Sequence, residues 1–156
     1  MPTIILETSI HAPIEICFDL SRSLDLHMLS TAKTREKAVG GRLSGLISLN
    51  ETVTWRAKHF GIYQHLIVRI TQMQKPFSFT DEMIKGAFKK MKHQHTFETK
   101  QDVTIMRDHF YFESPLGIVG HLFNYLVLTN YMRKFLIERN RVIKLVAENG
   151  DYKKYI

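Results

Sequence analysis

Residues 89–115 read KKMKHQHTFETKQDVTIMRDHFYFESP, and this stretch decides the fold. Apolar and polar side chains alternate on both sides of the short link KQD (residues 100–102), as is typical of β-strands with one buried face. Two such strands joined by so short a link are expected to pair as an antiparallel hairpin. The buried face of an antiparallel sheet must be covered by another layer, which the rest of the chain has to supply.

The sequence upstream of this hairpin predicts most of the remaining strands. Segments rich in Ile, Val, Thr and aromatic residues predict one strand in TIILETSIHA (residues 3–12), two in LISLNETVTWRAKHFG (46–61), one in IYQHLIVRITQMQ (62–74) and one in FSFTDEMIK (77–85). The glycine-rich segment VGGRLSG (39–45) is expected to be a loop.

Helical periodicity is found in two places. Pro13 suits the first turn of a helix, and Ser21–Ser23 are expected to divide residues 13–31 into two short helices. From about Ile118 to Ala147, apolar side chains recur at helix-like intervals with charged residues between them, which predicts one long amphipathic helix. The chain is therefore expected to be one α+β domain over residues 1–156, with a curved antiparallel sheet wrapped around the C-terminal helix and a candidate cavity between them.

This order of elements resembles the helix-grip fold of the START-like (SRPBCC) superfamily, which includes birch-pollen-allergen-like proteins, lipid-transfer domains and polyketide cyclase-like proteins. The resemblance rests on IHAPIEICFDL after the first strand, on the strands between Leu46 and Ser114, and on the terminal helix. More narrowly, ETVTWRAKHFG, FTDEMIKGAFKKMKHQHTF and TIMRDHFYFESPLG resemble a bacterial branch usually described as ligand-binding SRPBCC proteins. The resemblance implies that a hydrophobic or amphipathic small molecule binds in an internal cavity, and it implies no single activity.

His93 and His95 are candidates for a polar anchor in this cavity. Residues two apart in a strand point to the same face, so both histidines are expected to point inward together with Phe97. A hairpin loop of two or four residues places Asp108 beside them, whereas a loop of three residues would bring Arg107 into that row. Asp81 joins the cluster if its face of the preceding strand is also inward.

The cavity walls are expected to be mainly aromatic. Trp55 could stack on a ring-shaped ligand or belong to the core, and His59 and His65 are expected near strand ends and exposed. The predicted ligand-binding residues are Trp55, Phe79, Asp81, His93, His95, Phe97, Asp108, Phe110, Phe112 and Phe123.

Four interpretations of the His–Asp cluster stay open at this stage. It could anchor a mostly apolar ligand, or form a satisfied structural network that binds nothing. A metal site could use His93, His95 and an Asp, although no third histidine is evidently placed and no metal or cofactor is expected. In an enzyme, namely a cofactor-independent cyclase, dehydratase or hydrolase, His95, His93 and Asp108 would be the candidate catalytic residues.

Composition narrows the remaining classes of function. A single cysteine, Cys17, excludes an internal disulfide and a multi-cysteine zinc site, and a buried inert thiol is expected there. The net charge of +7 permits salt-sensitive binding to nucleic acid or an anionic membrane, but Lys and Arg are scattered, so no nucleic-acid partner is expected. The most apolar segment, GIVGHLFNYLVL, is too short to span a membrane, and no secretory signal is evident, so a cytoplasmic protein is expected. The sequence leaves open whether the chain forms a homodimer.

Overall fold

A computed structural model describes residues 2–115 and 117–156, with only the backbone described at positions 120, 121, 124 and 125. Within these residues, seven strands form one antiparallel sheet in the order β1-β7-β6-β5-β4-β3-β2. The strands are β1 (Thr3–Ile10), β2 (Lys37–Gly41), β3 (Thr52–His59), β4 (Ile62–Gln74), β5 (Ser78–Lys85), β6 (Lys90–Lys100) and β7 (Val103–Glu113). The predicted α+β helix-grip arrangement is confirmed.

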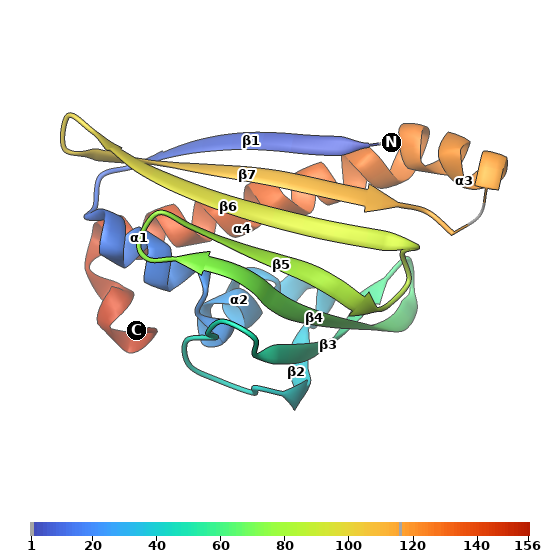
Figure 1. Ribbon diagram of the computed structural model, residues 1–156, viewed down its shortest axis with the longest axis horizontal. Helices are drawn as coiled ribbons and strands as arrows, with labels where there is room; N and C mark the ends of the chain where they lie inside the picture. Colours follow the sequence, from blue (N-terminus) through green and yellow to red (C-terminus); the bar gives the residue numbers. More distant parts are fainter. Residues whose placement is uncertain (1, 116) are drawn as a thin grey trace.

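The helices lie on one side of this sheet (Figure 1). Two short helices follow β1, and a long one runs behind β1, β7 and β6 in the view shown. The helices are α1 (Ile14–Ser21), α2 (Leu24–Ser30), α3 (Gly117–Phe123) and α4 (Thr129–Asn149), with a π-helical segment (Asn124–Leu128) between the last two and short 3-10 turns at Ala32–Thr34 and Asp151–Lys154. In the described part of the chain, no helix combines the length and the apolar character needed to cross a membrane.

Local signals account for the helix boundaries. The carbonyl of Pro13 accepts hydrogen bonds from the first turn of α1, and the Ser23 side chain accepts one from the backbone N–H of Leu26 as the N-cap of α2. Gly150, with φ of 84°, ends α4 in the left-handed conformation that glycine tolerates best. The predicted division of residues 13–31 into two helices is therefore confirmed.

The β6–β7 hairpin has a two-residue loop, the shortest of the three predicted lengths. Lys100 pairs with Val103, so Gln101 and Asp102 alone form the loop, and both have positive φ, 47° and 65°. Positive φ at both central residues matches the right-handed twist of hairpin strands. With this register His95 lies opposite Asp108, and Arg107 faces away from the histidines, opposite Thr96.

Two predictions between residues 39 and 61 are wrong. Part of VGGRLSG is strand β2, and LISLNETVTWRAKHFG contains one strand instead of two, with Leu46 making only an isolated bridge to Ser23. The glycines are in β2 because the chain passes close to β3: a Cβ on Gly41 would lie 2.3 Å from the Thr52 carbonyl oxygen. The predicted continuous helix from Ile118 is also interrupted, by the π-helical segment.

The core fills the space between the sheet and the helices. Phe18 of α1 packs edge-on against Phe79 and Phe97, with ring centroids 5.5 Å away in both cases. Helix α4 contributes the buried side chains of Met132, Leu136, Ile143 and Val146. Burying side chains of this size typically stabilises a fold by roughly 1.5–3 kcal/mol each, so these contacts hold α4 against the sheet.

Candidate ligand-binding site

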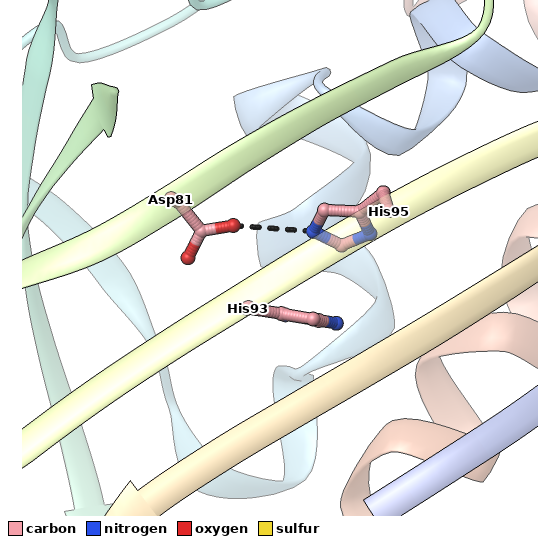
Figure 2. Close-up of side chains that lie close together, drawn as sticks. All are labelled: Asp81, His93 and His95. Carbon is pink, nitrogen blue, oxygen red and sulfur yellow. Dashed lines mark hydrogen bonds and ion pairs between the residues drawn. The ribbon is translucent and has the colours of Figure 1, made fainter. Parts of the chain in front are cut away.

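Three adjacent strands bring the predicted polar residues together. Asp81 of β5 pairs with His93 of β6, and His95 of β6 pairs with Asp108 of β7. His93, His95 and Asp108 are 6%, 2% and 0% exposed, and Asp81 is partly buried. Figure 2 shows Asp81 and both imidazoles gathered on one face of the sheet.

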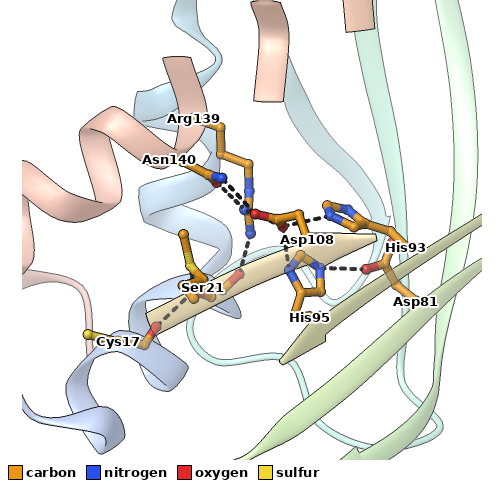
Figure 3. Close-up of polar contacts among 9 residues, drawn as sticks. Cys17, Ser21, Asp81, His93, His95, Asp108, Arg139 and Asn140 are labelled. Atoms are coloured by element: carbon orange, nitrogen blue, oxygen red, sulfur yellow. Dashed lines mark hydrogen bonds and ion pairs between the residues drawn. The ribbon is translucent and has the colours of Figure 1, made fainter. Parts of the chain in front are cut away.

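Asp108 accepts hydrogen bonds from two directions. Its Oδ1 lies 2.8 Å from Nε2 of His93, and its Oδ2 accepts a hydrogen bond of 2.6 Å from Nδ2 of Asn140 on α4. The Arg139 guanidinium lies 3.6 Å from Oδ1 of Asp108 and donates to the Asn140 side chain and to the Ser21 carbonyl. These contacts tie β6, β7, α4 and α1 together through buried groups (Figure 3).

His95 lies between the two carboxylates. Its Nε2 is 3.1 Å from Oδ1 of Asp81, and its Nδ1 is 3.0 Å from Oδ1 of Asp108. The Nδ1 contact is poorly aligned, so this nitrogen has no hydrogen bond among the described residues. The ring stacks on Phe79 at 4.2 Å and lies 3.8 Å from the His93 ring, measured between centroids.

Burial sets the protonation of this cluster. Burial, helped by the neighbouring His95, lowers the pKa of His93 to about 4, although the hydrogen bond with Asp108 opposes the shift, so His93 is a neutral imidazole at neutral pH. Burial alone would raise the pKa of Asp81 and of Asp108. Hydrogen bonds and nearby charge from the histidines outweigh it, and both pKa values lie below the ordinary range, that of Asp108 well below.

A pocket of about 580 Å³ lies between the sheet and α4. Most of its walls are apolar. Three residues of the polar cluster line this pocket, namely Asp81, His93 and Arg139. Of the predicted aromatic residues, Trp55, Phe110 and Phe123 line it. His95 and Phe79 line only a smaller neighbouring cavity of about 80 Å³, which Trp55, Asp81, His93 and Arg139 also border.

Phe97, Phe112 and Asp108, which are also among the predicted ligand-binding residues, line neither cavity. They do point inward, but the inward face of a strand is covered by different layers along its length. Phe97 lies under α1 against Phe18, Phe112 packs against Phe88 and Phe110, and Asp108 is enclosed by its polar partners. Strand alternation predicts the face but not which layer covers it.

A second polar group of the pocket comes from His27, Glu36, His59 and Tyr131. Nε2 of His27 lies 3.0 Å from Oε1 of Glu36, and the His27 ring packs on Trp55 with a centroid distance of 4.4 Å. Nδ1 of His59 lies 2.6 Å from the Tyr131 hydroxyl. His59 is therefore partly buried and not exposed as predicted, and this burial lowers its pKa. His65 is exposed, as predicted.

Arg139 and Asn140 were missed from the sequence, although a signal was present. They follow Leu136 by three and four residues and precede Ile143 by four and three, so they continue the buried stripe of α4. Polar residues at core positions of an amphipathic helix call for buried partners, and here the partner is Asp108.

Solved structures resemble this one over nearly the whole chain. The protein TTHA0849 from Thermus thermophilus has a TM-score of 0.73 and 15% identity, covering 94% of this chain and 100% of its own. Major latex-like protein 151 from Panax ginseng has a TM-score of 0.69 and 17% identity, and the match covers 94% of this chain and 97% of that protein. A START superfamily protein from Mycobacterium smegmatis has a TM-score of 0.69 and 9% identity, and the match covers 93% of this chain and 96% of that protein. The fold is that of the START superfamily.

No protein-family model and no curated protein matches the sequence. The three solved structures named above are at most 17% identical in sequence to this chain. At this level of identity they establish the START-like fold and do not identify a ligand. The site must therefore be interpreted from its own geometry.

Proposed function

We propose that this protein binds a hydrophobic or amphipathic small molecule in the pocket between the sheet and α4. The observation that carries the proposal is the pocket itself: about 580 Å³, with mainly apolar walls and a few polar groups. Small-molecule sites typically have volumes of roughly 300–1,000 Å³ and this kind of lining. The START-like fold supports the same function.

The polar groups of the pocket suggest how a ligand would be oriented. Asp81 and His93 reach the pocket from the sheet, and Glu36 reaches it beside His27. The Oε2 atom of Glu36 is buried and has no hydrogen-bond partner among the described residues. A buried acceptor without a partner is costly, so a ligand hydroxyl or amine that donates to Glu36 would be favoured over one that cannot.

A pair of variants tests the proposal with the neutral fluorescent probe N-phenyl-1-naphthylamine. Ala57 is buried on β3 and lines the pocket, whereas its neighbour Lys58 is exposed on the other face. Ala57→Phe should fill part of the pocket and weaken probe binding by about tenfold or more. The new phenyl side chain would keep one aromatic ring of the probe out of the pocket, and burial of that ring contributes more than about 1.4 kcal/mol to the binding free energy. Lys58→Phe should leave the affinity unchanged.

Equal affinities in the two folded variants would show that the probe binds elsewhere and would contradict the proposal. Native mass spectrometry of protein purified from its own host, followed by organic extraction, would then identify the natural ligand. The expectation of no nucleic-acid partner and the cytoplasmic location stay predictions, and whether the chain forms a homodimer stays open.

A further inference from the structure

We propose that Asp81, His93 and His95 form a binding site for a divalent transition-metal ion beside the pocket. One carboxylate oxygen and one ring nitrogen of each histidine all lie within 4.8 Å of one another (Figure 2). Two imidazoles and one carboxylate are a donor set suited to first-row divalent metals. The site comes from adjacent positions of β5 and β6, so paired strands hold all three side chains.

Asp108 orients the ring of His93. An ionised carboxylate only accepts hydrogen bonds, so Nε2 of His93, which lies 2.8 Å from Oδ1 of Asp108, carries the ring proton. The lone pair of the neutral His93 ring is then on Nδ1. A buried carboxylate behind metal-bound histidines is the usual way proteins fix this tautomer. Asn140 and Arg139 hold Asp108 in place.

The contact between His95 and Asp81 indicates where a metal ion would lie. Nε2 of His95 and Oδ1 of Asp81 are hydrogen-bonded at 3.1 Å, and a metal ion between the two atoms would take the place of the shared proton. The ring proton of His95 would then be on Nδ1, which lies 3.0 Å from Oδ1 of Asp108 and has no hydrogen bond among the described residues.

The separation of the donors indicates the coordination geometry. With metal–donor bonds of roughly 2.1 Å, two donors 3.1 Å apart subtend an angle of about 95° at the metal. This is close to the right angle between neighbouring ligands in a six-coordinate site and narrower than a tetrahedral angle. Three protein ligands then leave positions open, and because Asp81 and His93 line the pocket, the open side faces it.

Metal titration of the chelator-treated protein tests this proposal directly. Calorimetry with Co²⁺ should give one equivalent bound, with the weak visible absorption of a six-coordinate ion. Asp81→Asn and His95→Asn should each weaken binding by at least about 30-fold. Asp108→Asn should weaken it by roughly 10–100-fold, as expected for the group that orients the ligands. His109→Asn is the matched control, because His109 lies next to Asp108 on the opposite face of β7.

Two results would overturn the proposal. One is the absence of stoichiometric binding by the native protein, in which case the contact between His95 and Asp81 is only a hydrogen bond. The other is an equal loss of affinity in His109→Asn and His95→Asn, which would mean binding to surface histidines. Co²⁺ should also raise the melting temperature of the native protein but not of Asp81→Asn. These measurements need no organic ligand, so they are independent of the Ala57→Phe test of the pocket.

Discussion

At the scale of single residues, the interior of this protein is unusual in holding ionisable groups at the sheet–helix contact. Asp108 is fully buried and is matched by Arg139 and Asn140 from α4 and by His93 from β6. Buried ions are tolerated only when they are paired and hydrogen-bonded. Each member of the network therefore depends on the others.

Asp108→Asn should destabilise the protein by about 3–5 kcal/mol, because the similar-sized amide fits but leaves the Arg139 guanidinium without its buried counter-charge. Urea denaturation monitored by circular dichroism measures the free energy of unfolding. Asp102→Asn, the same substitution in the exposed hairpin loop, should change it by less than about 0.5 kcal/mol. A loss below about 1 kcal/mol in Asp108→Asn would show that the buried charge is dispensable.

Cys17 should be inert in the folded protein. Burial raises the pKa of its thiol from 9.0 to about 11, so at pH 8 only about one molecule in a thousand carries the reactive thiolate. Reaction with a thiol-specific disulfide reagent at pH 8 should be slow in buffer and fast in urea. Rapid modification of the folded protein would mean that the first helix opens readily.

At the scale of elements, the strands with strict alternation were predicted well and the edge of the sheet was not. The sequence restricted the β6–β7 loop to lengths that place either Asp108 or Arg107 beside the histidines, and the two-residue loop selects Asp108. Strand β2 was predicted as a loop because glycine usually marks loops. Here the glycines allow the close approach of β2 to Thr52 and Thr54 of β3.

A matched pair of glycine substitutions measures this close approach. Gly41 and Gly61 both have positive φ, 65° and 78°, so an alanine at either position should cost about 1–2 kcal/mol of stability. Gly41→Ala should cost more, by about 2 kcal/mol or greater, because its Cβ would clash with the Thr52 carbonyl, whereas nothing lies within 4 Å of a Cβ on Gly61. Equal melting temperatures for the two variants would contradict the inferred role of the glycines in β2.

At the scale of the whole molecule, the net charge of +7 and the internal pocket point to different partners. Surface binding to a polyanion releases counter-ions and weakens steeply with salt. A neutral molecule that enters an apolar pocket exchanges no counter-ions. Salt dependence therefore separates the proposed function from binding through the basic surface.

The dissociation constant for N-phenyl-1-naphthylamine should change by less than about twofold between roughly 50 and 500 mM NaCl. In the same buffers, any binding to double-stranded DNA should fall by orders of magnitude, as expected for phosphate contacts. Fluorescence titration measures the first and anisotropy of labelled DNA the second. Tight, salt-resistant DNA binding would argue against the pocket as the main binding site.

The sequence by itself determined most of the order of the elements and the face to which His93 and His95 point, because alternation and helical periodicity are local properties of the chain. Only the tertiary structure decided which inward residues border the pocket. Phe110 lines it while Phe97 lies under α1, since the layer that covers a strand comes from distant segments. It also revealed Arg139 and Asn140 as partners of Asp108, a contact between residues more than thirty positions apart that no local pattern specifies.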